Sequence, residues 1–263
     1  DEVMQVTPLD GPFGAAISGI DLAAGASDAT MRALIGLLHE HQALVILGQK
    51  LGKAEFLRFG KSWGDPIFFA KKSDTLGDFP EIIRISNETS TPERYRDGAI
   101  HWHSDNSYED EPASVTMLCC LETPEAQDQG WTCLASTVLA HDALPDGKKQ
   151  QIAGMTALHC LGGSPELPDE KIPIFPEAIA RHGITRHPRV MPHPVTGRKA
   201  LFTSGTAFGI EGMEIEEGRA FIAPLRAHIV APQFVMSYKV ISREVLLWDN
   251  FQTLHTATPI EYS

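Results

Sequence analysis

The strongest constraint on the fold is a pair of short polar segments that stand far apart in the chain and together carry metal-binding side chains. His103 and Asp105 lie in the first segment, and His255 lies in the second, 255 − 105 = 150 residues after Asp105. Side chains two residues apart on an extended segment point to the same side, so His103 and Asp105 can face one metal ion. A fold that uses all three must place a strand from the middle of the chain near a strand from its end.

Two imidazoles and one carboxylate form a ligand set with a specific chemical use. When they occupy three adjacent positions of an octahedron, three positions stay open, as in non-haem Fe(II) oxygenases, which hold a cosubstrate and O₂ together. From the residues alone a second interpretation stays open, because His-x-Asp also occurs as a surface polar pair. A histidine at a strand end, such as His255, is also commonly a hydrogen-bonded structural residue.

Composition and charge restrict the class of protein. The chain has 263 residues, 43% hydrophobic and 21% charged, which is typical of a globular protein and predicts one domain over residues 1–263. An excess of 34 acidic over 22 basic residues gives a formal charge of −12, so no nucleic-acid partner is expected. No apolar run is long enough to predict a membrane span. Four cysteines without a CxxC pair indicate reduced thiols and a cytoplasmic location.

Hydrophobic periodicity predicts strands in both halves of the chain, with a few helices between them. Helices are expected over residues 28–41, 54–63, 137–144 and 214–230. Strands are expected over residues 43–47, 82–85, 114–121, 234–240 and 245–248, with a hairpin over 190–203. The stretches 68–79 and 157–189 are expected to be loops, and the second is long and rich in proline, as loops that cover a site often are.

Beyond the ligand pattern, the sequence resembles a known family. Trp102 to Asp105 and Trp248 to His255 resemble, in residues and in order, the metal-binding motifs of the taurine dioxygenase and 2,4-dichlorophenoxyacetate dioxygenase family, which uses Fe(II) and 2-oxoglutarate. The resemblance covers most of the chain. It extends to residues 19–22, 47–49, 59–64, 130–132 and 193–199.

The resemblance implies a mainly β chain with flanking helices around a double-stranded β-helix, a distorted jelly roll whose open mouth holds the iron. It implies Fe(II), 2-oxoglutarate as cosubstrate and O₂, with His103, Asp105 and His255 as metal ligands. Thr132 occupies the threonine position of the family's Gly-x-Thr segment, whose hydroxyl holds the C1 carboxylate end of 2-oxoglutarate; threonine is also an ordinary strand residue. The family's arginine for the far carboxylate follows the distal histidine by more than ten positions. Because the sequence ends at Ser263, eight positions after His255 (263 − 255), we expect a missing C-terminal tail to carry it.

The same resemblance implies hydroxylation of a small anionic substrate, with 2-oxoglutarate converted to succinate and CO₂. Taurine-specific relatives carry a histidine after the Phe-Gly turn, whereas this chain has Ile67 and Phe68 there. An apolar, aromatic wall favours an aryloxyalkanoate-type carboxylate and its oxidative cleavage. Further candidates for the substrate pocket are Ile100, Ser107 and Phe208. Candidate cations for the substrate anion are Lys71, Lys72, Arg84, Arg94 and Arg96.

Two alternative functions stay open at this point. The same chemistry could act on a sulfonate, a sulfate ester or an amino-acid-derived metabolite. From a different class, a cupin-like barrel could serve as a non-catalytic binding module, although a pure binder has no need for three ligands with open positions. Besides the substrate, the expected partner is a second copy of the chain in a homo-oligomer.

The other histidines and acids near these segments have simpler interpretations. His101 lies two residues from His103 but is expected to support the site or be exposed rather than bind metal. Asp249 is expected to turn its strand, and His39, near a helix C-terminus, needs no ligand role. A second zinc site built from His182, His187 and His193 is the less favoured interpretation of those residues.

Overall fold

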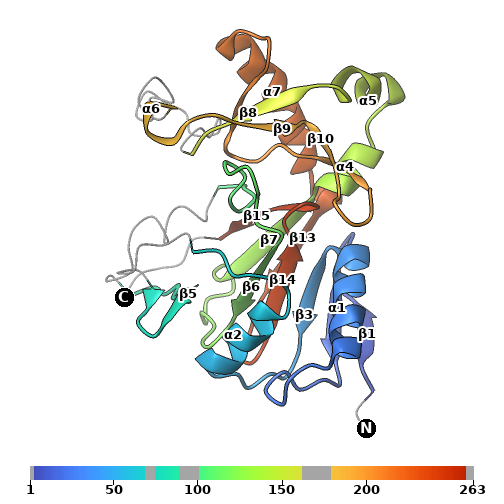
Figure 1. Ribbon diagram of the computed structural model, residues 1–263. Coiled ribbons are helices and arrows are strands. Elements are labelled where there is room, and N and C mark those ends of the chain that lie inside the picture. Colours follow the sequence, from blue (N-terminus) through green and yellow to red (C-terminus); the bar gives the residue numbers. More distant parts are fainter. Residues whose placement is uncertain (1–2, 69–74, 89–100, 162–178, 259–263) are drawn as a thin grey trace.

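Two antiparallel-rich sheets face each other at the centre of the molecule (Figure 1). The computed structural model describes residues 3–68, 75–88, 101–161 and 179–258. The larger sheet has the order β1 (Gln5–Pro8), β2 (Ala15–Ser18), β3 (Ala43–Ile46), β14 (Val245–Asp249), β6 (Val115–Cys119). The smaller sheet has the order β13 (Val235–Lys239), β7 (Trp131–Ser136), β15 (Thr253–Ala257). Every pair in these two sheets is antiparallel except β2 with β3.

Strand β14 shows why the larger sheet has two buried faces. All five of its residues are buried, which is the pattern of a strand covered on both sides. Val245 and Leu247 pack into a cluster with the first two helices, whereas Leu246 and Trp248 pack toward the smaller sheet. The second cluster, between the sheets, includes Leu134 of β7. Because side chains alternate along β14, one face of this strand packs against the helices and the other packs against the smaller sheet.

Two helices cover the outer face of the larger sheet. Helix α1 (Asp28–His41) begins where the Ser27 hydroxyl accepts a 3.1 Å hydrogen bond from the Thr30 amide, and it ends at Gln42 in the left-handed conformation. Leu34 and Leu38 of this helix belong to the cluster that contains Val245 and Leu247. Helix α2 (Lys53–Lys61) adds Phe59 to the same cluster.

A further layer lies above the facing sheets in Figure 1 and is built around α7 (Ile215–Ile229). A sheet of order β12 (Ala207–Ile210), β8 (Thr156–His159), β9 (Thr185–Pro188) packs on this helix through Ala157, Ile210 and Ile222. The remaining elements of the layer are α4 (Thr137–Asp142), α5 (Asp146–Ile152), α6 (Ile179–His182), the hairpin β10 (Val190–Pro192) and β11 (Lys199–Leu201), and the 3-10 turn η4 (Pro232–Phe234). A separate hairpin is formed by β4 (Thr75–Leu76) and β5 (Phe79–Ile83).

The structure confirms the expected mainly β chain with flanking helices, and most expected elements form within a few residues of the predicted bounds. The expectation of one long loop over 157–189 is wrong, because β8, α6 and β9 lie in it. Strand β8 is stabilised by the burial of Ala157 in a cluster with Ile222 of α7, which local sequence does not encode. The expected loop over 68–79 contains β4, and its residues 69–74, like 162–178 of the longer stretch, lie outside the described residues. Among the described helices, none combines the length and apolar composition needed to cross a membrane.

Candidate metal centre

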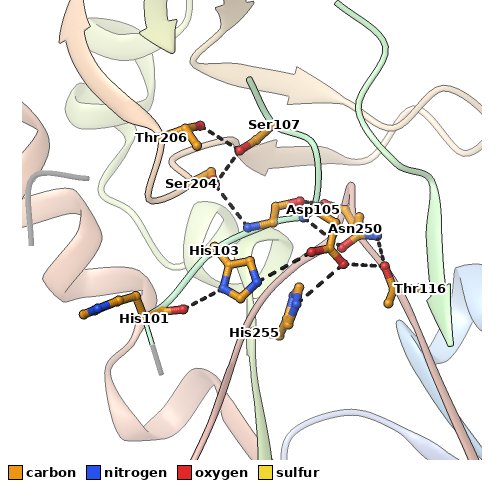
Figure 2. Close-up of polar contacts among 10 residues, drawn as sticks. His101, His103, Asp105, Ser107, Thr116, Ser204, Thr206, Asn250 and His255 are labelled. Atoms are coloured by element: carbon orange, nitrogen blue, oxygen red, sulfur yellow. Dashed lines mark hydrogen bonds and ion pairs between the residues drawn. The ribbon is translucent and has the colours of Figure 1, made fainter. Parts of the chain in front are cut away.

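The fold brings the middle of the chain beside its last strand, as the ligand pattern requires. His103 and His255 form an antiparallel β-bridge, in which the His103 amide donates to the His255 carbonyl at 3.0 Å and the His255 amide donates back at 2.8 Å. Asp105 follows where the segment leaves this bridge, and its carbonyl accepts the Ala113 amide at 3.2 Å. The side chains of His103, Asp105 and His255 point toward one another (Figure 2).

We call His103, Asp105 and His255 the metal triad, because their distances suit coordination of one ion. His103 Nε2 lies 3.5 Å from Asp105 Oδ1, and His255 Nε2 lies 3.6 Å from Asp105 Oδ2. One ligand atom from each residue lies within 4.8 Å of the others, and the two imidazole centroids are 4.1 Å apart. A metal ion at about 2.0–2.2 Å from each ligand atom would lie between them.

Hydrogen bonding leaves the nitrogens of this triad ready for a metal. The His101 carbonyl accepts a 2.6 Å hydrogen bond from His103 Nδ1, so a neutral His103 carries its proton there and directs the bare Nε2 at Asp105. His255 Nδ1 is buried and has no hydrogen-bond partner among the described residues. The predicted supporting role of His101 is performed by its backbone. Iron fits this donor set, since two imidazoles and a carboxylate are a ligand set of non-haem Fe(II) enzymes.

Electrostatics give Asp105 and His255 the protonation states that a metal needs, whereas Asp105 favours an extra proton on His103 that a metal would have to displace. Burial opposes ionisation of Asp105, but the neighbouring His255 and His103 and the Thr116 hydroxyl outweigh it and lower the pKa of Asp105 below its ordinary range. Burial, assisted by His103, lowers the pKa of His255 to about 3. For His103, burial lowers the pKa, but the hydrogen bond and charge of Asp105 prevail and raise it. At neutral pH the carboxylate is charged and His255 is neutral, as metal ligation requires.

Two side chains that sequence reasoning did not assign to the site hold the carboxylate in place. Thr116 on β6 donates from Oγ1 to Asp105 Oδ2 at 2.5 Å, and Asn250 Nδ2 donates to the same Thr116 oxygen at 2.8 Å (Figure 2). In the sequence, Asn250 is only one residue of the polar segment from Trp248 to His255. Thr116 gives no signal in the sequence, since threonine is a common strand residue and lies 11 positions from Asp105.

Thr132 lies on the same face of the smaller sheet as His255. It is buried in β7, where its cross-strand partner is Ala257, while Leu134, two residues further, pairs with His255. Directly paired residues and residues two apart share a face, so the Thr132 hydroxyl and the His255 imidazole both point between the sheets. The cosubstrate role of Thr132 stays a prediction.

The substrate-pocket candidates lie in different surroundings. Phe68 is 64% exposed and Ile67 is 40% exposed, so both offer apolar surface. Ser107 is buried, and its hydroxyl lies 2.7 Å from the hydroxyls of both Ser204 and Thr206 (Figure 2). Phe208 is buried in a separate cluster with Cys160. Ile100 lies outside the described residues, as do Lys71, Lys72, Arg94 and Arg96, and Arg84 pairs with Glu88 at 2.8 Å.

A second group of two histidines and an aspartate, His39, His193 and Asp249, also lies within 4.8 Å, and we call it the second triad. His193 Nδ1 accepts the amides of Val195 and Thr196, both at 3.1 Å, so its proton lies on Nε2 and is donated to Asp249 Oδ2 at 2.8 Å. Both nitrogens of this imidazole are therefore engaged. His182, His187 and His193 form no metal-binding group among the described residues.

Two facing sheets with a His-Asp-His set at one end define a jelly-roll protein with a candidate metal site. The chain belongs to the taurine catabolism dioxygenase TauD, TfdA family, whose model matches residues 5–263. This membership confirms the resemblance noted in the sequence. It also confirms the expected enzyme class, a 2-oxoglutarate-dependent dioxygenase that uses Fe(II), 2-oxoglutarate and O₂.

Individual relatives are similar over almost the whole chain. An alkylsulfatase of Acinetobacter baylyi is 27% identical over 97% of this chain and 80% of that protein. The alpha-ketoglutarate-dependent 2,4-dichlorophenoxyacetate dioxygenase of Cupriavidus pinatubonensis is 27% identical over 94% of this chain and 90% of that protein. The crystal structure of AAD-2 in complex with Mn(II) and N-oxalylglycine matches with a TM-score of 0.79 at 24% identity, covering 98% of this chain and 92% of that one. The similarity to solved structures of this family confirms the jelly-roll core.

Proposed function

We propose that the metal triad of His103, Asp105 and His255 holds Fe(II) and that this dioxygenase hydroxylates a small anionic substrate, with an aryloxyalkanoate-type carboxylate as the first candidate. The observation that carries the iron site is the β-bridge between His103 and His255, which places two imidazoles on either side of one carboxylate. The His103 hydrogen bond to the His101 carbonyl supports the same assignment, since it leaves Nε2 unprotonated.

When bound, Fe(II) with 2-oxoglutarate supplies the activation of O₂ that ends in succinate, CO₂ and a hydroxylated substrate. The chain's own residues hold and enclose that centre. The metal triad would hold the ion through one ligand atom from each residue, and the Thr132 hydroxyl, on the same face of the sheet as His255, would bind the cosubstrate. The Trp248 ring lies 4.7 Å from the His255 imidazole and shields it from water. Hydroxylation of a carbon next to oxygen would then cleave an ether.

Two lines of support favour the aryloxyalkanoate. Relatives named as acting on aryloxy acids include the 2,4-dichlorophenoxyacetate dioxygenase and the (S)-phenoxypropionate/alpha-ketoglutarate-dioxygenase of Sphingobium herbicidovorans, which is 26% identical over 97% of this chain and 89% of that protein. Ile67 and Phe68 also provide exposed apolar and aromatic surface. A sulfate ester is the second candidate, since the alkylsulfatase is as similar to this chain as the 2,4-dichlorophenoxyacetate enzyme.

The test is succinate formation from 2-oxoglutarate by the Fe(II)-loaded protein across a panel of phenoxyacetate, both phenoxypropionate enantiomers, an alkyl sulfate, taurine and an amino acid. We expect the aryloxy acids to give the highest turnover coupled to substrate loss. Higher turnover with the alkyl sulfate would overturn the substrate assignment and leave the enzyme class unchanged. Absence of a visible band on anaerobic addition of 2-oxoglutarate to the Fe(II) protein would overturn the proposed iron site.

We also propose that residues 1–263 form a single cytoplasmic domain that assembles into a homo-oligomer. One sheet contains β1 to β3 from the start of the chain and β14 from near its end, which supports one domain. The four cysteines are free thiols, which supports a reducing compartment. Analytical ultracentrifugation of the purified protein tests the oligomer, and a monomer at micromolar concentration would contradict it.

A further inference from the structure

The carboxylate of Asp105 is held by a chain of hydrogen bonds with one possible direction. Asn250 Nδ2 can only donate, so the Thr116 hydroxyl accepts from it at 2.8 Å. The single Thr116 proton is then left for Asp105 Oδ2, 2.5 Å away. The Asn250 amide is oriented independently, because its Oδ1 faces the Asp105 amide at 3.4 Å, and a flipped amide would place two donors against each other.

We propose that Thr116 and Asn250 are positioning residues that select Oδ1 of Asp105 as the metal ligand, an inference that rests on the proposed iron site. The hydroxyl proton occupies Oδ2 and weakens it as an electron-pair donor. Oδ1 lies 3.5 Å from His103 Nε2, so it faces a metal-binding nitrogen and not a hydroxyl donor. Binding through Oδ1 alone keeps three metal positions open, whereas binding through both oxygens would fill one of them.

The positions of these two residues explain how the constraint is maintained. Thr116 pairs with Trp248 across β6 and β14, so the larger sheet holds the carboxylate, while the smaller sheet supplies His255. Asn250 is almost fully buried, its amide donates to the Ser114 carbonyl at 2.9 Å, and its carbonyl accepts the Ser104 hydroxyl at 2.9 Å. The Asp105 carboxylate is therefore oriented by a residue of the larger sheet, whereas the neighbouring His255 belongs to the smaller sheet.

The experiment compares Thr116→Val, which keeps the shape and removes the hydroxyl, with Thr116→Ser, which keeps the hydroxyl. Thr123→Val is the matched control, because Thr123 donates to the Val240 carbonyl and contacts none of the triad. Co(II) is titrated into metal-free protein, and its visible absorption gives both affinity and coordination geometry. We expect Thr116→Val to weaken Co(II) about 10- to 100-fold and to change the band pattern, while Thr116→Ser and Thr123→Val stay close to the parent.

Three outcomes separate the possible errors. Parent affinity and an unchanged spectrum in folded Thr116→Val would overturn the positioning role and leave the metal site standing. Equal Co(II) binding by the parent and by His255→Ala would overturn the proposed metal site itself. If Thr116→Val does not fold, Asn250→Ala serves instead: it frees the Thr116 hydroxyl to rotate, and an unchanged Co(II) spectrum in this variant would overturn the inference.

Discussion

Two groups with the same residue types, the metal triad and the second triad, differ in how their polar atoms are used. In the second triad, both nitrogens of His193 are engaged, and Asp249 accepts from the Phe251 amide and the Gln252 side chain as well as from His193. In the metal triad, the facing imidazole nitrogens of His103 and His255 lie more than 3.4 Å from the carboxylate. Side-chain type and proximity therefore do not distinguish the two groups, whereas the number of uncommitted lone pairs does.

The largest expected effect is on catalysis, on replacing a member of the metal triad. Asp105→Ala and His255→Ala should abolish succinate formation, because each removes one of three protein ligands. The fold should persist, since these residues lie beside the packed clusters and not within them. Enzyme assays with circular dichroism on the same samples provide the measurement. Full turnover by Asp105→Ala would show that the two triads have been assigned the wrong way round.

A large effect on stability is expected from the second triad. His193→Ala removes a buried imidazole that donates to Asp249 Oδ2 and accepts the amides of Val195 and Thr196. Asp249 Oδ2 keeps the Gln252 side chain as a donor, and both amides belong to exposed residues. We expect a loss of about 2 kcal/mol in the free energy of unfolding, measured by urea denaturation, because a hydrogen bond to a charged group contributes about 1.5–3 kcal/mol. Co(II) affinity should stay within a few-fold. Loss of Co(II) binding without loss of stability would give the second triad a metal role.

Arg189 extends the comparison, because a buried polar group without a hydrogen-bond partner can also simply lower the stability of the fold. Its side chain is fully buried, and none of its three guanidinium nitrogens has a hydrogen-bond partner among the described residues. Burial, with a contribution from the charge of Arg226, lowers its pKa to about 10, so it remains charged at neutral pH. Arg189→Met should raise the free energy of unfolding by about 1–3 kcal/mol, by analogy with other buried charges replaced by apolar residues. A drop in stability would mean that the contact of the guanidinium with the Phe221 ring, whose centroid lies 6.0 Å from Arg189 Cζ, outweighs the cost of burying the charge.

The smallest expected effect concerns pH and His159. Burial, together with the charges of His187, Arg189 and Arg226, lowers the pKa of His159 well below 6.5. Below about pH 6.5, His159 therefore binds a proton in the unfolded chain but not in the folded chain. The free energy of unfolding is highest above this pH and falls as the pH drops below it. The loss is at most about 1.4 kcal/mol per pH unit for one group. Urea denaturation at pH 7.5 and 5.5 should show a shallower pH dependence for His159→Gln than for the parent, and equal slopes would refute the assignment.

The sequence predicted the metal triad more successfully than its surroundings. His103 and Asp105 are close in the sequence, and their motif and that of His255 carry the family resemblance. Thr116 could not be predicted, because its role depends on the pairing of β6 with β14, which sets its distance to Asp105. Likewise, β8 was missed because Ala157 becomes buried only when it packs in a cluster with β12 and α7. Local patterns thus predicted which three residues lie together, whereas tertiary pairing determined which side chains hold them.

The late position of β14 in the sequence determines when the larger sheet can be completed during synthesis. It lies between β3 and β6, which are synthesised about 200 and 130 residues earlier (245 − 46 = 199 and 245 − 119 = 126). Until β14 emerges, both earlier strands have an unpaired edge, and such edges promote association with other chains. Because β15 and its His255 follow β14, iron would be captured only after residue 255 has been made. The newly made protein therefore passes through a metal-free stage in which its exposed strand edges need protection by chaperones or by rapid completion of synthesis.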